Sequence, residues 1–160
     1  MRIEYVHASK YGNGAMVAEE FKHQMEARGV AVSVHHVRDI RPKELPAADL
    51  YLFSSPGRMG RPIGGMRRFL RKVDLAPGTR YALLTTEGAP QPDKDTGKLP
   101  TEEQRARHER VRPLMNETLQ AKGLSEVTED AVFVTGMKGP LEEGWQHKVE
   151  DFVSRIPVEP

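Results

Sequence analysis

Short apolar runs alternate with longer amphipathic segments in the first half of the chain, which predicts strands and helices in βαβ units. Residues 3–8 form the first apolar run and predict a strand. Apolar side chains then recur every four positions in residues 15–28, which predicts an amphipathic helix. Gly29 stands where helices commonly end, and residues 30–34 alternate between valine and more polar residues, as in an edge strand.

The middle of the chain continues this pattern. Residues 41–48 form a connector with two prolines, and the continuous apolar run at 50–53 predicts a strand that is covered on both faces. A turn-rich loop over residues 54–62 leads into a predicted helix at 63–73. The apolar run at 81–86 predicts the fourth strand.

A long polar loop and two further helices are predicted in the rest of the chain. After the loop at 87–100, Thr101 and Gln104 match a capping box, so a helix is expected to begin there and to break or kink at Pro113. Residues 131–134 predict the fifth strand. Pro140 is expected in the first turn of a final helix. The apolar stripe of this helix comprises Leu141, Trp145, Val149, Phe152 and Ile156.

Five strands separated by helices predict an α/β fold with a parallel sheet. Because β-α-β connections are right-handed, the simplest arrangement is a three-layer sandwich with strand order 2-1-3-4-5, formed by residues 1–160 as a single domain. Ligands of such sheets bind beyond the carboxyl ends of the strands, at the switch point between strands 1 and 3. The turn-rich loops after strands 1, 3 and 4 all begin at that edge.

Composition narrows the classes of function. Lys and Arg number 24 and Asp and Glu 23, and this near-neutral balance argues against a nucleic-acid partner. The absence of cysteine excludes disulfides, thiol catalysis and iron–sulfur ligation. No apolar run approaches the roughly 18 residues of a membrane span, and the first residues do not resemble a signal peptide. We therefore expect a cytoplasmic protein without a membrane span.

The loop after the first strand has the chemistry of an anion site. Small and hydroxyl residues between Ser9 and Gly14 precede a helix, whose first N–H groups and dipole favour an anion. Gly12 and Gly14 permit close approach and positive φ. The loop matches neither a Walker nor a GxGxxG pattern. In the alternative interpretation, its glycines serve only the geometry of a strand–helix turn.

Residues 5–14, Tyr-Val-His-Ala-Ser-Lys-Tyr-Gly-Asn-Gly, resemble the FMN phosphate loop of the flavodoxin superfamily, which reads S/T-x-x-G-N-T. The resemblance implies an FMN cofactor and a flavodoxin-like fold. Gly14 departs from the family by replacing its last hydroxyl residue, at an expected cost of about 1.5–3 kcal/mol in affinity. The implied phosphate-binding residues are Ser9, Lys10, Tyr11, Gly12, Asn13 and Gly14.

The loop after the third strand resembles the second flavin loop of flavodoxin-like NAD(P)H:quinone reductases, with Met66, Phe69 and Leu70 at matching offsets. Those three have helical spacing and are expected in the core. By resemblance, the loop after the fourth strand forms a third wall, although it lacks the stacking aromatic of short-chain flavodoxins. The implied flavin contacts are Pro56, Gly57, Arg58, Met59 and Gly60 in the second loop and Thr86, Glu87 and Gly88 in the third.

Two charged features have competing interpretations. Residues 55–73 contain six basic and no acidic residues. They can form a solvated helix face, or attract an anionic partner or a nicotinamide nucleotide. His35 and His36 adjoin on a strand and point to opposite faces, so an ordinary surface pair is favoured over a metal site.

The leading hypothesis is an FMN-binding electron-transfer protein that acts with a redox partner protein and uses no catalytic side chain and no metal. The first alternative is an FMN-dependent oxidoreductase with NAD(P)H, a quinone or protoporphyrinogen as its substrate. The second is a flavin-free interaction module with the same fold. A receiver domain is disfavoured, because receiver domains need an acidic pair after strand 1, where this chain has His7, Ala8 and Ser9.

Overall fold

The computed structural model describes residues 1–158, and its centre is a five-stranded parallel sheet. The two remaining strands within residues 1–158, β4 (Gly57–Arg58) and β5 (Arg61–Pro62), form a separate antiparallel hairpin. The predicted order 2-1-3-4-5 is confirmed, because β6 and β7 are the fourth and fifth strands of the central sheet. In spatial order the sheet consists of β2 (Ala31–His36), β1 (Arg2–His7), β3 (Leu50–Ser54), β6 (Arg80–Gly88) and β7 (Ser125–Val134).

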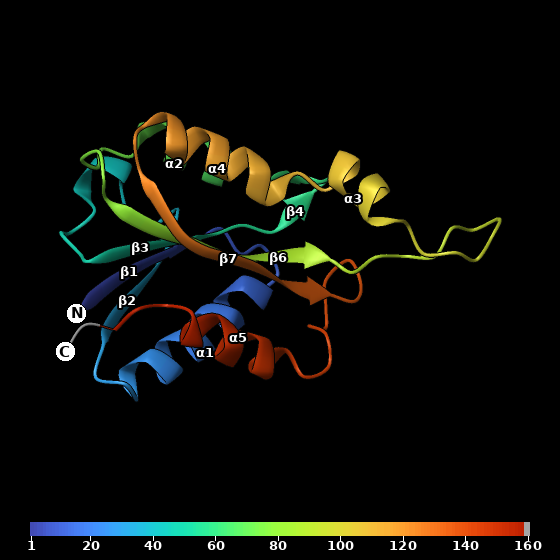
Figure 1. Ribbon diagram of the computed structural model, residues 1–160, viewed down its shortest axis with the longest axis horizontal. Helices are drawn as coiled ribbons and strands as arrows, with labels where there is room; N and C mark the ends of the chain where they lie inside the picture. The colour runs from blue at the N-terminus through green and yellow to red at the C-terminus, as the bar shows by residue number, and fades with distance from the viewer. Residues whose placement is uncertain (159–160) are drawn as a thin grey trace.

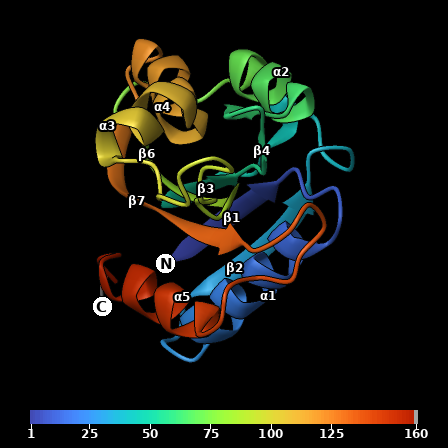
Figure 2. The same cartoon turned by 90° about the vertical axis from the view of Figure 1, so that its right-hand side faces the viewer.

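Helices cover both faces of the sheet and complete the predicted three-layer sandwich (Figures 1 and 2). Helices α1 (Asn13–Glu26) and α5 (Trp145–Ser154) lie on one face, and α2 (Gly64–Lys72) and α4 (Val111–Ala121) lie on the other. A short 3-10 helix, η1 (Pro42–Glu44), follows β2. No helix in residues 1–158 is long and apolar enough to cross a bilayer.

Each face of the sheet has its own hydrophobic core, because successive strand residues point to opposite sides. Tyr5 and Phe21 meet edge to face at 5.3 Å between ring centroids under α1, and Phe53 packs near Phe69 under α2. Every residue of β3 is buried, as its continuous apolar run predicts. Met66, Phe69 and Leu70 are core residues, which confirms that expectation.

The fifth strand of the sheet is longer than predicted. It begins at Ser125 rather than at residue 131. The prediction missed its first six residues, Ser125–Asp130, because they are mostly polar and have no apolar run. Arg112 and Asn116 of α4 contact the Glu129 carboxylate, at 3.4 Å and 2.5 Å respectively. Polar side chains can therefore face α4 along this edge strand with their hydrogen bonds satisfied.

Two predictions about proline are wrong. Pro113 does not break a helix, because the interruption comes earlier, at Glu109 and Arg110, and Pro113 lies in the first turn of α4, where no N–H is needed. Pro140 is not in a helical turn. It follows a cis peptide bond, and α5 begins only at Trp145.

The segment between β6 and α4 projects from the body of the protein (Figure 1). It contains a loop and helix α3 (Glu102–His108), which has no buried residue. The predicted capping box is confirmed, because Thr101 and Gln104 exchange hydrogen bonds at 3.2 Å and 2.9 Å. We call residues 89–108 the arm.

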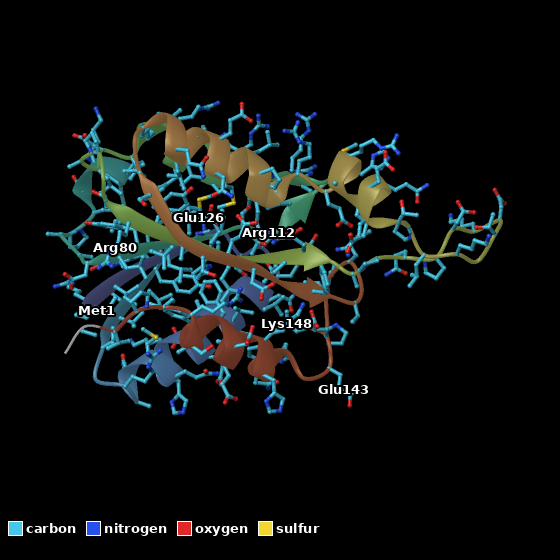
Figure 3. All side chains as sticks on the ribbon, viewed as in Figure 1. Met1, Arg80, Arg112, Glu126, Glu143 and Lys148 are labelled. Atoms are coloured by element: carbon cyan, nitrogen blue, oxygen red, sulfur yellow. The ribbon has the colours of Figure 1, made fainter. Side chains whose placement is uncertain are left out.

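The pKa of Glu126, which lies beneath α4 (Figure 3), predicts a specific pH dependence of stability. Burial, followed by Glu129, raises the pKa of Glu126, whereas Arg112 and Asn116 lower it, and the net result is a pKa of about 7 instead of the ordinary 4.5. The folded state thus holds a proton more tightly than the unfolded state. The resulting stability is fully present below pH 4.5 and is lost as the pH rises through about 7.

Glu126→Gln is therefore expected to stabilise the protein at about pH 8 and to reduce the decline in stability between about pH 5 and pH 8. Urea unfolding as a function of pH measures both effects. The matched control is Glu117→Gln, an exposed change on α4 that should leave the decline unaltered. An equal decline in the E126Q variant and the wild type would contradict the assignment.

Candidate functional site

The C-terminal ends of β1, β3 and β6 lie at one edge of the sheet, which Figure 2 views end on. The chain leaves β1 toward α1 on one face and leaves β3 toward α2 on the other. This divergence is the switch point at which sheets of this kind bind ligands. The three predicted segments therefore begin at the same edge of the sheet.

The predicted phosphate loop, residues 9–14, leads into α1. The helix begins at Asn13, two residues before the predicted start, and follows Gly12, whose φ is +91°. The Gly12 N–H donates to Ser9 Oγ at 3.0 Å. Among the described residues, no group accepts the N–H groups of Asn13, Gly14 and Ala15. Three open donors at the positive end of a 14-residue helix suit an anion.

The structure explains why residue 14 is a glycine. A Cβ at this position would lie 3.2 Å from Cβ of Ser9, closer than ordinary van der Waals contact. The Ser9 side chain thus occupies the space beside Gly14. This packing accounts for a small residue where the flavodoxin pattern has a hydroxyl residue.

Two histidines contact the backbone of Ser9. The Ser9 N–H donates to His7 Nδ1 at 3.2 Å, and His36 Nε2 lies 2.8 Å from the Ser9 carbonyl oxygen. Burial and the nearby His36 lower the pKa of His7 to about 4, whereas Asp39 acts in the opposite direction. His7 is therefore neutral at physiological pH and can accept this hydrogen bond.

The prediction that His35 and His36 point to opposite faces is confirmed, but the description of an ordinary surface pair is wrong. Both are partly buried and have specific partners. His35 Nε2 lies 2.6 Å from the buried Glu4 carboxylate, and His36 contacts Ser9. These partners come from β1 and its loop, so sequence adjacency gave no signal of them.

Two buried hydroxyls near the switch point have no hydrogen-bond partner among the described residues other than each other. They are Tyr5 Oη and Ser54 Oγ, on strands that adjoin at the switch point. Ser54 shares the face of Leu50 and Leu52, which pack in the core under α1. The Ser54 side chain counteracts the rise that burial causes in the pKa of Tyr5, so the two hydroxyls interact with each other and do not indicate a ligand site.

The rim of the phosphate loop is cationic. Lys10 Nζ and Lys138 Nζ lie 5.3 Å and 5.6 Å from the ring centroid of the exposed Tyr11. Lys138 comes from the loop after β7, and its carbonyl oxygen accepts a hydrogen bond from Asn13 Nδ2 at 3.1 Å. The Asn13 side chain thus ties the two loops together.

The second predicted loop is the β4–β5 hairpin. Met59 and Gly60 form its tip with φ values of +52° and +74°, as in the two-residue turns that suit hairpins. At its base, Ser55 Oγ accepts the Ile63 N–H at 3.1 Å, and Pro56 bridges to Thr86. The Met59 side chain is 93% exposed.

A cavity of about 340 Å³ lies between this hairpin and the end of β6. Predicted residues of the second and third loops meet in it, whereas the phosphate loop lies outside its lining. The structure thus divides the predicted site residues into two groups. The lining comprises Gly57, Met59, Gly60, Glu87, Gly88, Ala89, Pro90, Gln91, Pro100, Glu109 and Val111.

The predicted third wall is not a loop but the last residues of β6, because the strand runs to Gly88. Thr86 and Glu87 are buried. The Glu87 carboxylate accepts a hydrogen bond from Arg112 Nε at 2.8 Å and another from the Thr85 hydroxyl. Its charge is therefore neutralised from α4, and sequence reasoning missed Arg112 because it lies 25 positions away.

Gly60 connects the hairpin to the arm. Its carbonyl oxygen accepts the Arg110 N–H at 2.6 Å, and a Cβ on Gly60 would lie 1.6 Å from the His108 carbonyl oxygen. Gly60→Ala is therefore expected to destabilise the protein by about 2–4 kcal/mol, since the clash adds to the strain of a positive φ. Thermal and urea unfolding measure the change.

The matched control is Gly97→Ala, because Gly97 has a φ of +68° but open space around its Cβ position. It should cost only about 1 kcal/mol, from the backbone conformation alone. Equal losses in the two variants would contradict the close packing of the hairpin against the arm.

No protein-family model matches this sequence, and no curated protein matches it. Several solved structures do match. Flavodoxin 2 from Bacillus cereus has a TM-score of 0.69 and 19% identity, covering 97% of both chains. A flavodoxin from the domain Archaea has a TM-score of 0.68 and 17% identity, covering 96% of this chain and 94% of its own.

The match extends to one part of a larger enzyme. Rubredoxin oxygen:oxidoreductase from Desulfovibrio gigas has a TM-score of 0.66 and 12% identity, covering 97% of this chain and 35% of that one. At these identities the likeness concerns architecture. Together with the sheet order and the two helical layers, it identifies the fold of this chain as flavodoxin-like.

Proposed function

We propose that this protein binds FMN at the switch point and transfers electrons to or from a redox partner protein. The observation that carries the proposal is the set of open N–H donors of Asn13, Gly14 and Ala15 at the switch point of a flavodoxin-like sheet. A helix start that directs such donors outward is suited to a phosphate ester.

The residues around these donors also fit FMN. Ser9 keeps a hydroxyl hydrogen to donate, because its oxygen accepts from Gly12. Lys10 and Lys138 supply positive charge at the rim. These contacts bind and orient the cofactor without a proton transfer.

The flavin ring is assigned to the side of the hairpin and β6. The cavity there is within the roughly 300–1,000 Å³ usual for small-molecule sites. Glycine backbone at Gly57, Gly60 and Gly88 lines it and can approach a planar ring closely. Bound FMN would supply the one- and two-electron chemistry, and the protein would supply position and electrostatics.

The visible absorption spectrum of the purified protein tests this proposal. We expect a flavin spectrum, or quenching of FMN fluorescence with one-to-one stoichiometry when FMN is added. Protein that is colourless and leaves FMN fluorescence unchanged at micromolar concentration would contradict FMN binding. That result would favour the flavin-free interaction module.

An FMN-dependent oxidoreductase is the second candidate, and the exposed basic residues Arg58 and Arg61 of the hairpin favour it. They adjoin the cavity and can attract the phosphates of NAD(P)H. Anaerobic mixing of the FMN-loaded protein with NADPH or NADH separates the two functions. Rapid bleaching of the flavin supports the enzyme, whereas no bleaching by either nucleotide supports the carrier.

A further inference from the structure

The hairpin and α2 carry a strongly one-sided charge. The basic residues in 55–73 are all exposed, and none of them has an ion-pair partner within residues 1–158. We call this group the basic face. It consists of Arg58, Arg61, Arg67, Arg68, Arg71 and Lys72.

The rest of the chain has the opposite balance. Without these six cations, 18 of the 24 Lys and Arg remain against all 23 Asp and Glu. Many of these remaining charges are paired with each other, such as Arg107 with Glu103 and Arg155 with Asp130. The basic face is therefore a local feature and not part of a generally basic surface.

An exposed apolar side chain lies within the basic face. In the described part of the chain, Tyr11, Met59 and Met137 lie in loops that follow strands of the sheet, whereas Met16 lies on α1 and Leu99 lies on the arm. Met59 is the most exposed of them and stands between Arg58 and Arg61 at the hairpin tip. The full set is Tyr11, Met16, Met59, Leu99 and Met137.

We propose that the hairpin tip and the basic face form a docking surface for a protein with an acidic surface around an apolar spot. Charge complementarity identifies the partner, because unpaired cations attract carboxylates and speed encounter. A flexible methionine at the tip can adapt to an apolar contact. This inference rests on the proposed function, because it names the class of redox partner with which the electron-transfer site acts.

An acidic protein suits this surface better than a nucleic acid or a membrane. The sequence pI is about 8.0, below the values above 9 that mark nucleic-acid-binding domains. An extended polyanion would also meet the acidic remainder of the chain. The carboxylates of a compact protein face only the patch they contact.

The test is an NMR titration of the ¹⁵N-labelled full chain, as purified. The probes are an acidic plant-type ferredoxin, a basic cytochrome c, a short DNA duplex and anionic lipid vesicles. Salt is kept at about 10 mM, where the Debye length is about 30 Å. We expect the ferredoxin to shift amide signals of the hairpin and α2, and to lose this effect as salt approaches about 1 M.

Three variants make the test specific. Arg58→Gln/Arg67→Gln/Arg68→Gln is expected to weaken ferredoxin binding about tenfold. Met59→Asn, which keeps a residue that tolerates positive φ, should weaken binding without changing its salt dependence. The control, Lys22→Gln/Lys94→Gln/Lys98→Gln, removes the same charge from positions outside the hairpin and α2 and should change affinity less than about twofold.

Shifts located away from the hairpin and α2, or equal losses in the basic-face and control variants, would overturn the proposal. Stronger binding of cytochrome c, DNA or vesicles than of ferredoxin would also overturn it. Because the readout is an amide shift, the result does not depend on flavin content. Failure of docking and failure of FMN binding are therefore distinguishable.

Discussion

Gly12→Asp is expected to lower the affinity for FMN about 100-fold, because a carboxylate near the open N–H donors competes with the phosphate and repels it. Gly12 has a φ of +91° and open space at its Cβ position. Aspartate is among the residues that tolerate this conformation. The change therefore tests electrostatics with little steric disturbance. Fluorescence titration with FMN measures it.

Two comparisons isolate the phosphate. Gly12→Asn has nearly the same shape without the charge and should weaken FMN binding by less than about fivefold. Riboflavin, which lacks the phosphate, should bind the Asp and Asn variants equally. If G12D and G12N bound FMN alike, or if G12D weakened riboflavin as strongly as FMN, the phosphate would not lie at the start of α1.

Arg112→Leu is expected to destabilise the protein by about 2–4 kcal/mol, because it leaves the Glu87 carboxylate buried without its cationic partner. Arg112 contacts Glu87 at 2.8 Å and Glu129 at 3.4 Å, and the Glu87 side chain is only 4% exposed. Figure 3 shows Arg112 beneath α4, in the layer that faces β7. Urea unfolding at neutral pH measures the loss.

A second substitution separates charge from packing. Glu87→Gln added to Arg112→Leu should recover more than half of the loss, since it removes the buried charge. The control is Arg107→Leu, which breaks a pair whose side chains are 67% and 85% exposed and should cost less than about 1 kcal/mol. A double variant no more stable than R112L would show that lost packing dominates.

The local features of the fold were predictable from the sequence because they depend on neighbouring residues. The apolar run of β3 and the periodicity of α1 each lie within one continuous segment of the sequence. Right-handed connections then determine how parallel strands can follow one another. The phosphate loop is likewise contiguous, so its glycines and its position before a helix could be recognised directly.

Errors arose where a residue's role depends on a distant partner. The polar start of β7 is a strand because its backbone pairs with β6, while α4 satisfies its polar side chains, and no apolar pattern indicates these contacts. Pro113 looked like a break in a helix because sequence alone could not place the end of α3 at His108. The partner of the Glu87 carboxylate, Arg112, lies 25 positions away, and no pattern in the sequence indicated it.

By itself, the sequence determined the parallel sheet, its strand order and the position of a glycine-containing loop before a helix start, since periodicity, connection handedness and helix starts are local properties. Only the tertiary structure decided how that loop is supported by His7 and His36, why Gly14 is small, and that the hairpin meets the end of β6 around a cavity. These depend on contacts between segments far apart in the chain. Such contacts leave no periodic signal, because each residue is selected by a partner that only folding brings near.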